Sequence, residues 1–211
     1  MKVSELWRYP VKSMAGEKLQ SALVGKDGIA GDRVVQVVSK AWGLITSRTH
    51  PELLLLHARL DDDGEPQIDG RSWKDEWSAA SVRAAVSPDA ALVPHGEGRF
   101  DVLPLLVATD GAIARFGHDV RRLRPNLVIS GVEGLGEREW PGKALRIGDC
   151  LIGVHSLRGR CVMTTFDPDT GEQDREVLRK IGREFGGRLA LNSWVMEGGS
   201  IAIGDEVELI G

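Results

Sequence analysis

A cysteine that follows two nearby arginines and precedes an acidic turn is the feature of this sequence best suited to chemistry. The stretch LRGRCVMTTFDPDTG, residues 157–171, carries Cys161, one of only two cysteines in the chain. Arg158 and Arg160 favour the thiolate over the thiol, and the thiolate is both the nucleophile and the metal ligand. The alternative is a small buried hydrophobe, which is what a free cysteine most often is. We interpret Cys161 as a reactive thiol.

The other cysteine has a different setting. Cys150 follows a Gly-Asp turn and enters the apolar segment LIGV, with no cation directly beside it. We therefore expect Cys150 to be a packed thiol without a chemical role.

Basic and polar side chains recur where predicted strands end beside glycine or proline. Loops on a rigid scaffold are common positions for binding groups. Each of these residues alone would most often be a solvated surface charge, but together they could hold a phosphate, with about 1.5–3 kcal/mol for each charge-assisted hydrogen bond. The residues are Lys12, Ser13, Arg33, Arg124, Asn126 and Arg160.

Three other motifs are weaker. FDPDTG, residues 166–171, resembles the D-x-D-x-T motif of aspartate-nucleophile phosphatases, but the parallel α/β pattern that this chemistry needs is missing, and an Asx-type turn is the better interpretation. The five histidines include no H-x₃-H pair, and His155 with Cys161 lacks a second pair for zinc. No G-x-S-x-G nucleophile elbow occurs.

The composition limits the class of protein. The chain has 211 residues, 42% hydrophobic and 27% charged, with a net charge of −4, so it can form one large or two small globular domains. The charge gives no reason to expect a nucleic acid or an anionic membrane as partner. No secretory h-region or membrane-length apolar run is visible, and two cysteines make no disulfide framework, so we expect a cytoplasmic protein. Two cysteines are also too few for an ordinary iron–sulfur cluster, so electrons for redox chemistry would come from elsewhere.

The pattern of elements predicts a β-rich, barrel-like α+β architecture with few helices. Residues 3–13 read as a strand ending at a proline, and 18–25 and 33–39 as two strands around a tight loop. Residues 42–48 read as a short strand, and 51–64 as a short helix that runs into a strand. Residues 61–100 are the least regular, and we place a subdomain boundary there, giving 1–95 and 96–211.

The second half has clearer signals. Residues 105–109 predict a strand followed by a helix that Asp110 could cap, and 124–131 predict another strand. The two Gly-Asp segments 144–154 and 200–210 each predict a hairpin. Residues 175–186 form the one clear amphipathic helix. No regular βαβ alternation runs through the chain, which disfavours a doubly wound nucleotide fold.

Taken together, RYPVKSMAGE, GDR, RLRPNLVISG and RCVMTTFDPDTG occur in an order that resembles the MOSC-domain proteins (molybdenum cofactor sulfurase C-terminal domain), in particular their amidoxime-reducing branch. The resemblance covers nearly the whole chain. It implies a MOSC-type β-barrel core, an N-terminal β-barrel subdomain, a few peripheral helices and a bound molybdenum cofactor, a pterin dithiolene that holds the metal and carries a phosphate.

The resemblance also implies roles for individual residues. The metal-ligating cysteine of the family falls on Cys161, and a soft thiolate suits a sulfur-rich metal centre. The positions that match cofactor-binding residues of the family are Lys12, Ser13, Arg33, Thr109, Arg124, Asn126, Arg160 and Asn192.

The activity implied by the resemblance is reduction of N-hydroxylated compounds, such as amidoximes and hydroxylamines, by removal of the oxygen. The chain shows neither the ferredoxin-like domain of some bacterial relatives nor a membrane anchor, so a separate ferredoxin, flavoprotein or cytochrome would supply the electrons. Asp167, Asp169 and Glu137 are conceivable proton donors. Two alternatives stay open, namely a sulfur carrier with a Cys161 persulfide and a non-catalytic cofactor-binding protein.

Overall fold

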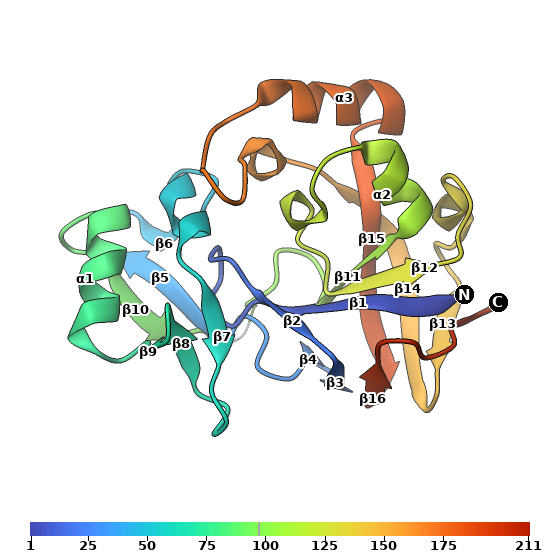
Figure 1. Cartoon of the computed structure of the whole chain (residues 1–211), viewed down its shortest axis with the longest axis horizontal. Helices are drawn as coiled ribbons and strands as arrows, with labels where there is room; N and C mark the ends of the chain where they lie inside the picture. The colour runs from blue at the N-terminus through green and yellow to red at the C-terminus, as the bar shows by residue number, and fades with distance from the viewer. Residues whose placement is uncertain (97) are drawn as a thin grey trace.

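An eight-stranded mixed sheet is the largest element of the computed structural model, which describes residues 1–96 and 98–211 (Figure 1). Its strand order is β17-β13-β14-β15-β11-β12-β1-β2. The strands are β1 (Lys2–Arg8), β2 (Glu17–Leu19), β11 (Leu105–Thr109), β12 (Leu127–Ser130), β13 (Ala144–Ile147), β14 (Cys150–Gly159), β15 (Arg188–Glu197) and β17 (Glu208–Ile210). β11 and β12 are parallel, and the other neighbouring pairs are antiparallel.

The sheet closes on itself through the segment that leads into β17. The backbone N–H of Val3 donates to Asp205 (2.9 Å), and that of Val207 donates to Met1 (2.9 Å). Lys2 forms an isolated antiparallel bridge with Glu206. Because β17 pairs with β13 and the segment before it pairs with β1, the strands from β1 round to β17 form a barrel. Closure of this kind leaves few unpaired strand edges.

The interior of this barrel is the largest hydrophobic core. Val107, Leu127 and Leu145 are among its fully buried residues, and each comes from a different strand. Alternate residues of a strand point to opposite faces, so a closed sheet places one set of apolar side chains inside. A small sheet packs beside it, made of β16 (Gly199–Ala202), β3 (Ser21–Gly25) and β4 (Gly28–Ile29).

The first half of the chain contributes a second core. It contains the sheet of β10 (Ala91–Pro94), β5 (Val35–Ser39) and β6 (Gly43–Ile45), and the sheet of β7 (Ala58–Leu60), β8 (Pro66–Ile68) and β9 (Arg71–Ser72). The 3₁₀ helix η1 (Pro51–Leu55) and helix α1 (Glu76–Ala85) pack with them, at the left of Figure 1. Asp75 caps α1 by accepting from the Ser78 N–H (2.8 Å), a capping signal in the region that sequence reasoning judged irregular.

A third cluster covers one end of the barrel. Helix α3 (Arg175–Phe185) turns Val177, Ile181 and Phe185 inward against helix α2 (Asp110–Phe116). Their spacing of four residues is the helical repeat, so the predicted amphipathic helix is confirmed. The remaining short elements are the 3₁₀ helices η2 (Val120–Arg122), η3 (Gly136–Glu139) and η4 (Val162–Thr165). Among the helices of the described residues, none is long and apolar enough to cross a membrane.

The β-rich fold class is confirmed, but two local pairings are wrong. The hairpin of β13 and β14 forms as predicted. The segment 200–210 is not a hairpin, because β16 pairs with β3 and β17 pairs with β13. Nor do the strands on either side of residues 26–32 pair with each other, since β3 turns back on β4 and β5 lies between β6 and β10. In the first case the true partners, β3 and β13, are distant in sequence from β16 and β17. In the second, the predicted loop itself contributes β4, which pairs with β3 in the place expected for β5. The division at residue 95 stays a prediction.

Candidate functional site

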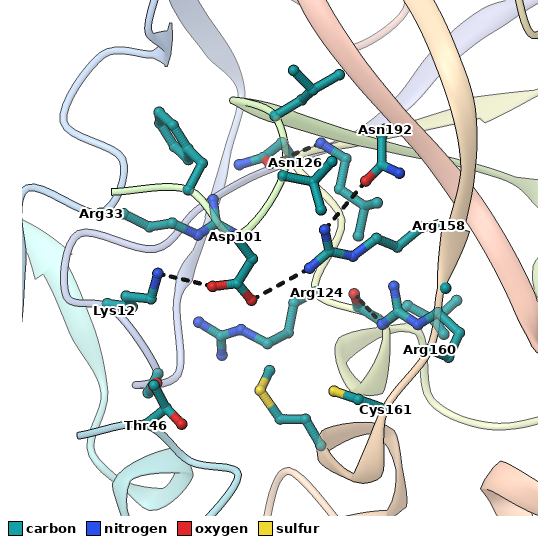
Figure 2. A pocket seen from close by; sticks show the side chains of 18 of the residues that line it. Lys12, Arg33, Thr46, Asp101, Arg124, Asn126, Arg158, Arg160, Cys161 and Asn192 are labelled. Atoms are coloured by element: carbon teal, nitrogen blue, oxygen red, sulfur yellow. Dashed lines mark hydrogen bonds and ion pairs between the residues drawn. The ribbon is translucent and has the colours of Figure 1, made fainter. Parts of the chain in front are cut away.

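A single cleft gathers residues from both halves of the chain, including Lys12 and Cys161 (Figure 2). The residues predicted for a site that line it are Lys12, Ser13, Arg33, Arg124, Asn126, Arg160, Cys161 and Asn192. Sequence reasoning did not place Thr46, Arg48, Phe100, Asp101, Arg158 and Met163 in the site, but they line the cleft as well. The cleft is therefore mainly cationic, with one exposed thiol at its edge.

Two turns bring the N-terminal cations together. The chain after β1 runs beside the turn before β5, with hydrogen bonds from the Arg33 N–H to the Tyr9 carbonyl (2.8 Å) and from the Lys12 N–H to the Val35 carbonyl (2.8 Å). The fully buried carboxylate of Asp32 accepts from the Tyr9 N–H (2.7 Å) and pairs with the Arg33 guanidinium. These bonds hold Lys12 and Arg33 on the same side of the cleft.

Backbone strain is concentrated in the cleft. Ser13, Arg33 and Arg124 have φ values of 74°, 53° and 56°, in the left-handed region that non-glycine residues rarely adopt. Only Asp69 and Ala190 share this property in the described chain, and neither lines the cleft. Such conformations cost about 1–3 kcal/mol each and persist where the surrounding structure over-determines them, often at functional sites.

Arg124 is, with Lys12, one of the buried cations of the cleft. Its guanidinium lies over the Tyr9 ring, 4.2 Å from the centroid, and its Nη2 has no hydrogen-bond partner in the described structure. Burial lowers the pKa of Arg124 to about 10, so the side chain remains charged at neutral pH. A buried guanidinium with a free N–H group is costly without a partner, and this arrangement favours an anion.

Arg160 and Cys161 directly follow the end of β14. The Arg160 Nη2 donates to the Leu123 carbonyl (2.8 Å), while its Nε is buried without a partner in the described structure. Burial, assisted by the charge of Arg158, lowers the pKa of Arg160 to about 10. Cys161 is exposed and precedes η4, and its carbonyl accepts from the Thr164 hydroxyl (2.9 Å). The thiol is therefore accessible on an ordered backbone. Cys150 is fully buried, and burial raises the pKa of its thiol to about 11, as its predicted packing role requires.

The acidic turn after Cys161 is structural. Asp167 Oδ1 accepts from the N–H groups of Asp169 (2.9 Å) and Thr170 (3.1 Å), which confirms the predicted Asx-type turn. Arg122 donates to the Thr165 carbonyl (3.0 Å) and pairs with Asp167 (2.8 Å). This clamp ties the segment after Cys161 to η2, which precedes Arg124.

The two asparagines of the cleft are bonded to the protein. The Asn126 amide donates to Asp32 Oδ2 (3.1 Å), and its oxygen accepts from the Leu106 N–H (3.2 Å). Asn192 on β15 accepts from Arg158 (3.3 Å) and donates to the Ser156 hydroxyl (3.2 Å). Both side chains are in place at the cleft, and both hold neighbouring groups in position.

Arg48, Arg158 and Asp101 form a cluster that was not predicted as part of the cofactor site, although Arg158 was noted as a cation near Cys161. Arg158 and Arg160 are two residues apart, and in a strand such residues share a face, so the signal for Arg158 was present. Arg48 follows β6 and obeys the same strand-end pattern as Arg33. Asp101 lies between β10 and β11, where the sequence has no motif to mark it.

Thr109, which the resemblance places among the cofactor-binding residues, does not line the cleft. It is fully buried and caps α2, because its hydroxyl oxygen accepts from the Ala112 N–H (3.3 Å). Its hydroxyl donates to Glu137 Oε2 (3.2 Å). Asp110, predicted to cap this helix, instead accepts from the N–H groups of Gly131 (2.7 Å) and Val132 (3.0 Å).

Thr109→Ala is therefore expected to lower the free energy of unfolding by about 1–2 kcal/mol, the usual cost of losing a helix cap. Thr109→Ser should retain most of the stability, because its hydroxyl can make the same bonds. Urea unfolding followed by circular dichroism measures both. A fully stable Thr109→Ala variant that no longer binds an anion in the cleft would show that Thr109 belongs to the binding site.

None of the three conceivable proton donors lines the cleft. Asp167 and Asp169 pair with Arg122 and Arg121, and Glu137 is buried beside Thr109. Burial raises the pKa of Glu137. Asp101 is the only acid that lines the cleft among the described residues.

The fold and the site define a class: β-barrel proteins whose cationic cleft carries an exposed cysteine. Family models match at residues 1–75, described as the MOSC N-terminal beta barrel domain, and at residues 109–208, described as the MOSC domain. The chain therefore belongs to the MOSC-domain proteins that carry this N-terminal domain.

Two named proteins and one solved structure are similar to this chain. Mitochondrial amidoxime-reducing component 1 of Homo sapiens is 25% identical over 281 residues, which covers 99% of this chain and 83% of the human protein. Molybdenum cofactor sulfurase of Anopheles gambiae is 37% identical over 83 residues, which covers 39% of this chain and 10% of the sulfurase. The crystal structure of the YuaD protein from Bacillus subtilis has a TM-score of 0.55 at 13% identity, covering 99% of this chain and 94% of that chain, and shares the fold.

Proposed function

We propose that this protein is a molybdenum-cofactor-dependent reductase of N-hydroxylated compounds. The observation that carries the proposal is that an exposed thiol lines a cationic cleft in which some guanidinium N–H groups have no partner in the described structure. The likeness to an amidoxime-reducing component over 99% of the chain supports this reaction.

The residues of the cleft fit the chemistry of the cofactor. A pterin that ends in a phosphate needs anion donors, and Arg124 Nη2 and Arg160 Nε are buried donors without partners in the described structure. Lys12, Ser13 and Arg33 add cations and a hydroxyl from the opposite side of the cleft. Cys161 would provide the metal ligand, because a soft thiolate suits a sulfur-rich centre. When bound, the cofactor supplies the two-electron chemistry that removes oxygen from nitrogen.

In this proposal the residues of the chain bind the cofactor, orient it and shield it from water. The bonds of Asp32 and Asn126 hold the turns that present the cations, and the Arg122 clamp holds the segment after Cys161. Conversion of an N–OH group into N–H and water takes two electrons and two protons. The electrons would come from a separate donor protein. Asp101, the acid that lines the described cleft, is paired with three cations that hold its pKa below the ordinary value, so solvent is the source of these protons in this proposal.

A sulfur carrier is the second candidate, because a molybdenum cofactor sulfurase is 37% identical over 83 residues. In that function Cys161 would carry a persulfide for delivery to a metal–sulfur cofactor. The exposed position of the thiol allows this chemistry equally well.

The test combines elemental analysis with turnover. The full-length protein, purified from cells that make the cofactor, should contain molybdenum and should reduce a model amidoxime with a reduced dye as electron donor. Molybdenum without turnover would favour a non-catalytic binding protein. A Cys161 persulfide seen by mass spectrometry, without molybdenum, would favour the sulfur carrier.

A further inference from the structure

One carboxylate occupies the centre of the cations at the cleft. Asp101 Oδ1 pairs with Lys12 Nζ (2.9 Å), and Asp101 Oδ2 pairs with Arg158 (3.3 Å), as Figure 2 shows. Asp101 Oδ2 also pairs with Arg48. These three cations come from the turn after β1, the end of β14 and the loop after β6. Segments far apart in the sequence thus converge on a single acidic group.

The position of Asp101 is supported by its own segment. Lys12 Nζ also donates to the Arg99 carbonyl (2.9 Å), and the Arg99 side chain donates to the Asp27 carbonyl (3.3 Å). The Asp101 side chain is 35% exposed, whereas that of Lys12 is only 9% exposed. The Arg158 side chain is 20% exposed and that of Arg48 is 42% exposed, so the carboxylate is more exposed than Lys12 and Arg158 but less exposed than Arg48.

Asp101 carries its charge at neutral pH. Burial works to raise its pKa, but the hydrogen bond from Lys12 and the charges of Arg48 and Arg158 outweigh burial and hold the pKa below its ordinary value. A carboxylate held by three cations makes the same kind of contacts that a bound phosphate would make. Lys12 and Arg158 are then partly neutralised before any ligand arrives.

We propose that Asp101 competes with an entering anion for Lys12, Arg48 and Arg158, the cations of the cleft that it already holds, so that the cofactor-free protein selects a doubly charged phosphate over singly charged anions. The inference rests on the proposed function, since it concerns how the phosphate of the cofactor enters. A monoanion brings no more charge than the carboxylate that it must displace. A phosphate monoester carries about −1.5 to −2 at pH 7 and three acceptor oxygens, so it gains from the exchange.

The experiment measures anion binding by the full chain, purified from cells that make no molybdenum cofactor. Calorimetric titration with inorganic phosphate at pH 8 should show that Asp101→Asn binds about tenfold more tightly than the wild type. This factor corresponds to the loss of three partly exposed ion pairs that compete with the ligand. Asp101→Glu, which keeps the charge, should stay within about threefold of the wild type.

Asp169→Asn is the matched control, because Asp169 pairs with Arg121 and does not line the cleft. Its phosphate affinity should equal that of the wild type. Formate should bind the wild type more weakly than phosphate does and should bind Asp101→Asn more tightly than it binds the wild type. Where Asp101→Asn does not fold, Asp101→Ser replaces it.

Weaker or unchanged phosphate binding by Asp101→Asn would overturn the proposal, and would mean that the carboxylate holds the cations in place for the ligand. An absence of phosphate binding by both proteins would overturn it as well. Neither result depends on molybdenum or on turnover. A protein that binds phosphate as described but lacks reductase activity would instead count against the proposed function alone.

Discussion

Cys161→Ser is expected to lower reduction of a model amidoxime by more than about 100-fold, since changes to residues that merely support a metal ligand already cost about 10–100-fold. Serine has nearly the size of cysteine, and residue 161 is exposed, so folding should be unaffected. A serine oxygen is a harder ligand than a thiolate sulfur, which changes the metal site. Cofactor retention should fall less than activity, because the phosphate contacts do not involve the thiol. The measurement pairs the turnover rate with molybdenum content.

Cys150→Ala is the matched control for this prediction. Cys150 is fully buried in the barrel core, where a serine hydroxyl would lie among apolar residues, so alanine is the milder replacement. The variant should lose some stability and keep most of its activity per bound molybdenum. Wild-type turnover by molybdenum-loaded Cys161→Ser would show that the thiolate is not the ligand.

Arg124→Ala is expected to reduce retention of the cofactor by about 10–100-fold, the effect of losing a charge-assisted hydrogen bond of about 1.5–3 kcal/mol. Arg124 is buried, lies over the Tyr9 ring and has an unpartnered Nη2 in the described structure. The backbone of residue 124 is left-handed, and alanine is strained there as much as arginine is, so the substitution should change the backbone little. The fraction of molybdenum that remains after gel filtration measures retention.

Arg121→Ala provides the comparison three residues away. Arg121 pairs with Asp119 (2.7 Å) and Asp169 (2.6 Å) on the surface, and it does not line the cleft. Exposed ion pairs contribute little to stability, so this variant should retain the cofactor like the wild type. Equal losses in the two variants would contradict the assignment of Arg124.

Much of the candidate site could be predicted because its signals are local. Arg160 precedes Cys161 in the chain, and Cys150 has no adjacent cation, so the contrast between the two thiols needs no tertiary information. The Asx turn at Asp167 and helix α3 are similarly determined by neighbouring residues. The resemblance to the MOSC family supplied Asn192, which no local pattern marks.

The sequence by itself determined which residue types stand at which strand ends, and hence the candidate thiol Cys161 and most of the cationic residues of the cleft. Only the tertiary structure decided which strand ends meet. It placed β16 beside β3, buried Thr109 as a helix cap and brought Asp101 among Lys12, Arg48 and Arg158. The physical reason is that strand partners and long-range ion pairs depend on the closure of the whole sheet, whereas turns and charge neighbours along the chain depend on a few adjacent residues.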